Sequence, residues 1–128
     1  MIRIRLTSVM VDDQEKAHKF YTEVLGFVTK NDIPMDGPRW LTVVAADGSG
    51  GVELLLEPVG QEFAATFQKA LFDANIPLTA FATDDIQAEY ERLLKLGVKF
   101  RGEPSQGPGP STVSFEDTCG NLIQLFQL

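Results

Sequence analysis

The segment VDDQEKAHKFYTEVLGF, residues 11–27, decides the fold because the chain repeats its plan once. The second copy is TDDIQAEYERLLKLGV, residues 83–98. In both copies an Asp pair opens an amphipathic run that ends at a Leu-Gly pair, and Asp84 follows Asp12 by 72 residues in a chain of 128. A duplicated module of this size predicts two halves assembled around a shared cleft, where a binding or active site is expected.

Each copy of the repeat predicts a helix with a capping residue at its start and a glycine at its end. Asp12 and Asp84 are the predicted N-caps, because a short carboxylate accepts a hydrogen bond from an unpaired N–H group of the first turn. Apolar residues then recur at helical spacing, which predicts one buried face for each helix. Gly26 and Gly97 are expected to end the helices, since a left-handed residue is least strained without a Cβ atom.

Strand-like segments surround each predicted helix. They cover residues 2–11, 27–33, 39–46 and 51–58 in the first half and 78–83, 98–101, 111–116 and 121–127 in the second. Between the halves, Phe63, Phe67 and Leu71 keep helical spacing and predict a connecting helix over 61–74. The sequence therefore predicts one α+β domain, residues 1–128. Its two βαβββ modules cover about 1–58 and 77–128 and are joined by this helix.

Charge and composition argue against several classes of partner. Eighteen acidic residues against eleven scattered basic ones give a net charge of −7, whereas nucleic-acid binding requires clustered Lys and Arg. Apolar stretches are far shorter than the roughly 20 residues that cross a bilayer, so no membrane partner is expected. No apolar segment follows Arg3 and Arg5, so no signal peptide is expected. Cys119 is the single cysteine, which favours a cytoplasmic location.

Three motifs carry a family resemblance. They are V-x-D at 11–13 leading into F-Y-x-x-x-L-G-F at 20–27, the strand V-E-L-L-L at 52–56, and F-x-D-x-x-G-N at 115–121. Together they resemble the vicinal oxygen chelate superfamily, which includes glyoxalase I, extradiol dioxygenases and the fosfomycin- and bleomycin-resistance proteins. The resemblance covers essentially the whole chain. It implies that each module curls into a half-barrel with its helix outside, and that the two half-barrels form one open cavity.

The same resemblance implies where a metal would bind. Enzymes of the family hold a divalent metal with His, Glu or Gln, and the matching positions here are Leu6, Glu53, Leu78 and Gln124. Two of the four are leucine, and shifting either first strand by one residue supplies no usual ligand. One carboxylate and one amide fall short of the three or four ligands that a transition metal requires. The sequence therefore predicts no cofactor and no divalent metal.

Glu53 and Gln124 are the polar residues left at those positions. Strand alternation puts Glu53 on the face opposite Leu54 and Leu56, so it is expected to point into the cavity. It is the candidate catalytic residue, as a general base, or an anchor for a cationic or hydroxylated ligand. It equally fits an internal pair with an Arg or water, or a remnant of a lost metal site. Gln124 either orients a polar ligand or bonds to Glu53.

Arg39 and Trp40 are the other candidate ligand-binding residues. An aromatic wall beside a guanidinium suits a planar or anionic small molecule. The alternative is a packed Trp beside a solvated Arg. Met10 and Phe126 could line the same cavity, although core packing explains each of them as well.

Three functions stay open on the sequence. The first is a homodimer that sequesters a small organic molecule, as bleomycin-resistance proteins do by shape and charge without a metal. The second is a glyoxalase-like lyase or isomerase, or a dioxygenase, with an atypical site on Glu53 and Gln124. The third is an interaction or regulatory protein without a small-molecule site. A homodimer is expected because a half-barrel leaves strand edges that one chain covers poorly.

Overall fold

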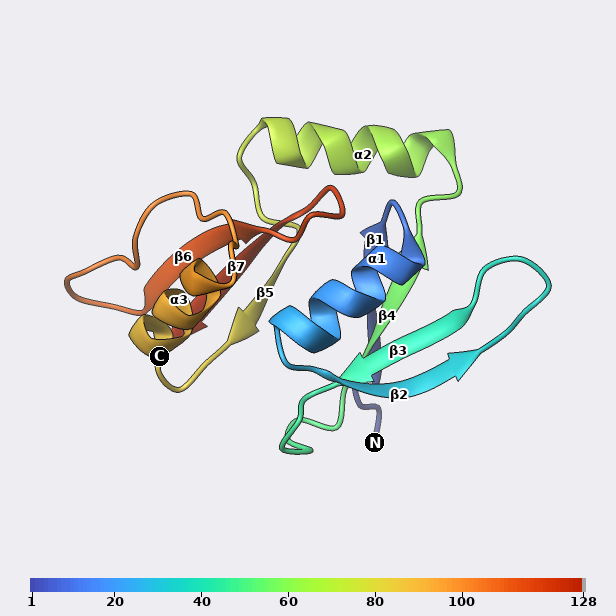
Figure 1. Cartoon of the computed structure of the whole chain (residues 1–128), viewed down its shortest axis with the longest axis horizontal. Helices are drawn as coiled ribbons and strands as arrows, with labels where there is room; N and C mark the ends of the chain where they lie inside the picture. The colour runs from blue at the N-terminus through green and yellow to red at the C-terminus, as the bar shows by residue number, and fades with distance from the viewer. Residues whose placement is uncertain (128) are drawn as a thin grey trace.

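The computed structural model describes residues 1–127 as two modules joined by a helix (Figure 1). The first module consists of β1 (Leu6–Val11), α1 (Gln14–Lys19), the π-helical turn η1 (Phe20–Val24), β2 (Val28–Ile33), β3 (Trp40–Val44) and β4 (Glu53–Pro58). The connecting helix is α2 (Glu62–Asp73). The second module consists of β5 (Thr79–Ala82), α3 (Ile86–Lys95), β6 (Ser111–Glu116) and β7 (Leu122–Gln127). Within residues 1–127, no helix has the length and apolar character to cross a membrane.

Each module forms its own sheet, and the two sheets share one topology. The strand orders are β1-β4-β3-β2 and β5-β7-β6. In both sheets the first strand of the module lies at an edge and runs parallel to the last strand, so that Leu6 is opposite Glu53 and Ala80 is opposite Gln124. The predicted α+β class and the internal repeat are confirmed, and the described strands form no closed barrel.

The second sheet is smaller than predicted. The segment 98–101 does not form a strand, and Phe100 makes only an isolated bridge to Phe115. Two flanking hydrogen bonds, Arg101 N–H to Ser114 O (2.8 Å) and Glu116 N–H to Lys99 O (2.9 Å), complete the pairing. The chain turns at positive φ on both sides of this segment, at Gly97 and Gly102, which leaves no room for a longer ladder.

The helix starts are displaced by one residue from the prediction, whereas the helix ends are confirmed. Asp13 Oδ1 accepts from Lys16 N–H and Asp85 Oδ1 from Ala88 N–H, each at 3.0 Å, so these residues are the N-caps in place of Asp12 and Asp84. In an Asp pair either residue matches the preference for Asp at the N-cap, and only the backbone geometry selects which one caps the helix. Gly26 and Gly97 end the helical runs with φ of 90° and 87°.

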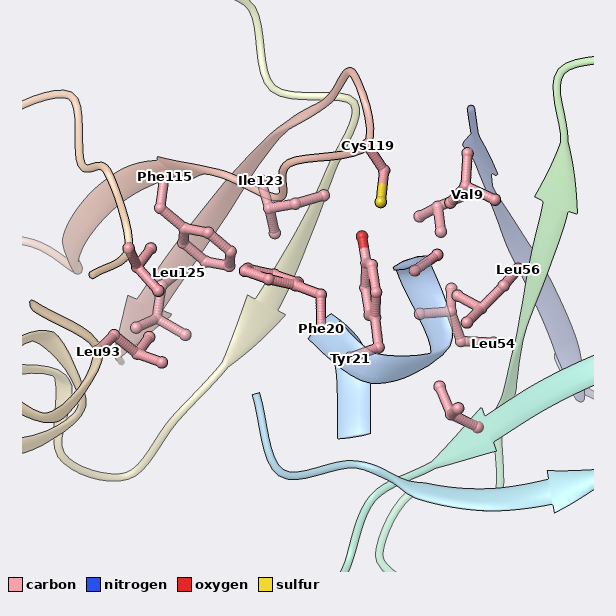
Figure 2. Packing of buried hydrophobic residues seen from close by; sticks show 14 of the residues in the cluster. Val9, Phe20, Tyr21, Leu54, Leu56, Leu93, Phe115, Cys119, Ile123 and Leu125 are labelled. Carbon is pink, nitrogen blue, oxygen red and sulfur yellow. The ribbon is translucent and has the colours of Figure 1, made fainter. Parts of the chain in front are cut away.

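The core lies between the two modules, around α1 and η1 (Figures 1 and 2). Tyr21 packs edge-on against Phe81 of the second module, with ring centroids 6.4 Å apart, and Phe20 lies 6.5 Å from Phe115. Figure 2 shows the two rings of η1 between side chains from both sheets. The FY pair therefore joins the modules, and its predicted packing role is confirmed.

Both sheets turn their apolar residues toward this shared core. Val9, Leu54 and Leu56 contribute from the first sheet, and Ile123 and Leu125 from the second. Since alternate side chains along a strand point to opposite faces, the other face of each sheet is turned away from the core. We call these the open faces. Glu53 lies on the open face of the first sheet and Gln124 on that of the second.

Candidate ligand-binding site

Glu53 is held on the open face of the first sheet by two neighbouring strands. Its Oε1 accepts from Thr42 Oγ1 at 2.8 Å and from Asn31 Nδ2 at 2.9 Å. Asn31 Nδ2 also donates to Thr42 Oγ1 at 3.2 Å. Within residues 1–127, the Oε2 atom accepts no hydrogen bond from another side chain. The carboxylate is thus fixed through one oxygen and presents the other.

A β-bulge places Asn31 in this group. Thr29 pairs with Val43, yet Asn31 pairs with Thr42, so Lys30 is the extra residue on β2. In a regular ladder Lys30 would stand opposite Thr42 and the side chain of Asn31 would point to the other face. Sequence analysis named neither Asn31 nor Thr42, and the facing of Asn31 depends on a bulge that no local pattern reveals.

Glu53 lines a shallow cleft. Its volume is about 450 Å³, and Arg5 and Lys30 are its cationic residues. Arg5 is anchored at the carbonyl of Gly51, at 3.5 Å from Nη1, and its backbone carbonyl accepts from the N–H of Glu53. Leu6, half exposed at 45%, stands opposite Glu53 on the edge strand. The cleft therefore combines the carboxylate of Glu53 with two positive charges and the apolar side chains of Val44 and Val52.

Arg39, just before β3, is bound to acidic residues and forms no hydrogen bond with Glu53. Its Nε and Nη2 atoms donate to the two carboxylate oxygens of Asp32 at 3.0 and 2.8 Å, and Nη1 lies 3.7 Å from Glu15. The hydrogen bonds from this guanidinium hold the pKa of Asp32 below its usual range. Trp40, half-buried, is two residues from Thr42 on β3 and so shares its face.

Gln124 lies on the other sheet, and the predicted contact with Glu53 does not form within the chain. The partners of Glu53 are Asn31 and Thr42, so the expected hydrogen bond to Gln124 or Arg39 is wrong for the single chain. A contact between Glu53 and a ligand stays a prediction. In the register of the second sheet, the residue opposite Gln124 is Ala80.

The residues at the positions that match the metal ligands of vicinal oxygen chelate enzymes do not fit a divalent metal. Leu6, Leu78 and Ala80 offer no donor atom, and one oxygen of Glu53 is already saturated by two hydrogen bonds. Within residues 1–127, no three His, Cys, Asp or Glu side chains are grouped so that they could hold a metal ion. Transition metals require three or four such ligands.

A buried polar group at Asp117 links the F-Y-x-x-x-L-G-F motif of the first module with the F-x-D-x-x-G-N motif of the second. Asp117, fully buried, accepts from Tyr21 Oη at 2.7 Å, from Cys119 N–H at 2.8 Å, and from the backbone and side-chain N–H groups of Asn121 at 3.0 and 2.8 Å. Gln68 of α2 adds hydrogen bonds to Met10 O and Asn121 Oδ1. Figure 2 shows the Tyr21 hydroxyl pointing toward the turn that carries Cys119.

Tyr21 and Cys119 of this group have raised pKa values, as expected for side chains with a structural role in the core. Burial, reinforced by the charge of Asp117, raises the pKa of Tyr21 well above its usual value. Burial likewise raises the pKa of the Cys119 thiol to about 12. Because a nucleophilic cysteine acts as its thiolate, Cys119 is protected from reaction rather than activated.

Comparisons with known proteins give one consistent family. A model described as Glyoxalase/Bleomycin resistance protein/Dioxygenase superfamily matches residues 3–125. The uncharacterized protein YurT of Bacillus subtilis (strain 168) is 47% identical over 126 residues, 98% of this chain and 99% of that protein. The crystal structure of UcmS2 has a TM-score of 0.85 at 34% identity, covering 98% of both chains. TnmS3, an antibiotic binding protein from Streptomyces sp. CB03234, has a TM-score of 0.78 at 32% identity, covering 99% of this chain and 96% of that chain.

Proposed function

The chain belongs to the Glyoxalase/Bleomycin resistance protein/Dioxygenase superfamily, and we propose that it binds a small organic molecule on the open face around Glu53 without the help of a metal. The supporting observation is the fixed carboxylate: Thr42 and Asn31 saturate Oε1 and leave Oε2 as an acceptor. A preorganised acceptor lowers the ordering cost of binding. The similarity to an antibiotic binding protein supports the same kind of ligand.

The chemistry of the face indicates which ligand groups would bind. Glu53 Oε2 accepts a hydrogen bond from a hydroxyl or amine group of the ligand. Leu55 and Trp40, both half-buried on this face, supply apolar contact for the body of the molecule. Because Arg39 is hydrogen-bonded to Asp32, it would contact a ligand only at the edge of the site.

We further propose that the complete site requires a homodimer. Each open face is turned away from the core of its own chain, so one chain leaves Glu53 and Leu6 half exposed on a broad surface. A two-fold related copy would lay the open face with Gln124 and Phe126 over the face with Glu53, twice per dimer. The prediction of the contact between Glu53 and Gln124 then applies between protomers. Light scattering above micromolar concentration is expected to give twice the 14.1 kDa mass of one chain, and a mass of one chain would overturn the proposal.

The binding test begins with a thermal-shift screen of small organic molecules on protein purified without added metal. A ligand present at 100 times its Kd raises the free energy of unfolding by about 2.7 kcal/mol, which a thermal shift detects. Binding of the best compound is then measured for Glu53→Gln. The glutamine keeps an oxygen for Thr42 and Asn31 but replaces the free acceptor with an NH₂ donor.

Two outcomes of this substitution are separable. A loss of affinity of about tenfold, or 1.4 kcal/mol, with the fold intact would establish Glu53 as a ligand contact. Unchanged affinity would mean that the carboxylate is a remnant. Glu62→Gln on the exposed side of α2 makes the same charge change away from the site and is the matched control.

A second candidate function follows from the same oxygen. A fixed carboxylate with one free oxygen suits a general base, as a lyase or isomerase requires. Conversion of the bound compound, lost in Glu53→Gln while binding persists, would favour this enzyme function. Binding without conversion in the wild type would favour the binding protein.

A further inference from the structure

A cleft separate from Glu53 lies between the two modules, on the core side of the sheets. Its volume is about 500 Å³. The loop after β3 and the loop after β5 border it, and both lie at the same end of the molecule in Figure 1. None of Arg39, Trp40, Glu53 and Gln124 lines it. The volume falls within the range of about 300–1,000 Å³ that is usual for small-molecule sites.

The floor of this cleft is apolar and aromatic. Phe27 follows the helix of the first module and Phe81 lies on β5 of the second, with ring centroids 5.3 Å apart and ring planes at 75°. Both rings are half-buried, so part of each remains open to the cleft. Leu93 and Leu125 close the base from α3 and β7. An aromatic or aliphatic group would bury apolar surface here.

The rim of the cleft carries excess negative charge. Its charged residues are Asp47, Asp84, Glu89 and Arg92. Arg92 is bound to Glu89 Oε2 at 2.7 and 3.0 Å and to the carbonyl of Val24 at 2.9 Å, so this pair is internally neutralised. Asp47 and Asp84, both exposed, remain as two negative charges on opposite loops. Hydrogen bonds from Ser49 keep the pKa of Asp47 below its usual range, and it is ionised at neutral pH.

From this geometry we propose that the cleft is a second ligand site, selective for amphipathic organic cations. The apolar body of such a molecule would contact Phe27 and Phe81, and its protonated amine would lie between Asp47 and Asp84. The aromatic faces favour a cation as well. This site is independent of the one proposed around Glu53, so either can fail without the other.

The test uses three probes of one size that differ in charge. They are 2-naphthylmethylammonium, the neutral 2-naphthylmethanol and the anionic 2-naphthylacetate, titrated into the ¹⁵N-labelled protein and followed by NMR. The cation is expected to bind at least tenfold more tightly than the anion, with amide shifts centred on Gly26, Ala46 and Thr83. Equal affinity for all three probes, or shifts centred on Glu53 and Thr42, would overturn the proposal.

Two variants separate charge from shape. Asp47→Asn with Asp84→Asn is expected to weaken binding of the cation about tenfold and leave the neutral probe unchanged, because each exposed carboxylate contributes modestly in water. Asp36→Asn with Glu62→Gln removes the same charge elsewhere and is expected to have at most a small effect. Ala46→Leu, at the exposed rim, is expected to block all three probes. Unchanged cation binding in the first variant or in Ala46→Leu would contradict the proposed site.

Discussion

The two sheets share a topology and differ in their open faces. In the first sheet, β2 adds Asn31 to Thr42 and Glu53, and three polar side chains from three strands form one group. In the second sheet, the position beside Gln124 is Ala80 and the fourth strand is reduced to one bridge. The core-facing positions of the repeat remained apolar, because both modules pack on one core. The open faces carry no such constraint: the first presents a fixed carboxylate, and the second presents Gln124 and Phe126.

The largest expected effect is at the group that holds the two modules together. Asp117→Ala removes the acceptor of four hydrogen bonds and leaves the hydroxyl of Tyr21 and backbone N–H groups buried without partners. We expect a loss of about 3 kcal/mol or more in the free energy of unfolding, measured by urea denaturation. Both modules should still unfold in one transition, because they share a core.

Tyr21→Phe, which removes one of these hydrogen bonds, is the milder control, with an expected loss of about 1–2 kcal/mol in the free energy of unfolding. A loss below 1 kcal/mol for Asp117→Ala would contradict this role.

The next effect tests the difference between the two open faces. Thr42→Val keeps the volume of a fully buried side chain and removes one donor to Glu53. It is expected to cost about 1–2 kcal/mol of stability and to weaken any ligand held by Glu53. Thr112→Val, the same change on the open face of the second sheet, is expected to stay within about 0.5 kcal/mol. Similar losses for the two variants in urea denaturation would show that the faces do not differ in this way.

A smaller effect tests where the modules are equivalent. Asp13→Ala and Asp85→Ala each remove an N-cap of the same geometry, and each is expected to cost about 1 kcal/mol. Their neighbours Asp12→Ala and Asp84→Ala should change the free energy of unfolding by less than half as much. A larger loss of stability for Asp12→Ala or Asp84→Ala than for their neighbours would show that Asp12 and Asp84 are the N-caps, as the sequence predicted.

The smallest effect concerns pH and the buried thiol. The pKa of Cys119 is raised from 9.0 to about 12, so the folded state disfavours the thiolate. Its contribution to stability is complete below pH 9 and is lost as pH rises from about 9 toward 12, at no more than about 1.4 kcal/mol per pH unit. Cys119→Ala should remove this slope between pH 9 and 10. Above pH 10 the raised pKa of Tyr21 adds a loss of the same sign.

Thiol labelling gives an independent check on Cys119. The native protein is expected to react slowly with a thiol reagent at neutral pH, because the side chain is buried and protonated. Denatured protein should react at the rate of a free cysteine. Rapid labelling of the native state would show that the turn at 117–121 opens.

Much of the fold was predictable because the signals for it are local. Glycines at 26 and 97 end helices, apolar spacing gives the helix faces, and alternation gives the side of the sheet on which Glu53 lies. Two local predictions missed by small margins. The caps moved by one residue, because backbone geometry selects between two Asp residues that satisfy the same rule. Segment 98–101 kept a single bridge, because the chain turns at Gly97 and Gly102 on either side of it.

The candidate site was predicted only as single residues. Glu53 lies on the face opposite Leu54 and Leu56, as alternation predicted, while its partners Asn31 and Thr42 were not found. The bulge at Lys30 decides that Asn31 faces Glu53, and a bulge depends on how two strands pair rather than on either strand alone. The bond between Arg39 and Asp32 likewise joins residues from two segments and was not predicted, and a ligand contact of Arg39 stays a prediction.

By itself, then, the sequence determined the two-module plan, the helix ends, the family motifs and the scarcity of metal ligands, since each is written in neighbouring residues or in residue identity. Only the tertiary structure decided which residues meet. Tyr21 and Asp117 are 96 positions apart and share a 2.7 Å hydrogen bond, and the core they stabilise turns the two open faces away from it. Contacts at that separation are set by how the sheets and helices pack, which no local pattern of one chain records.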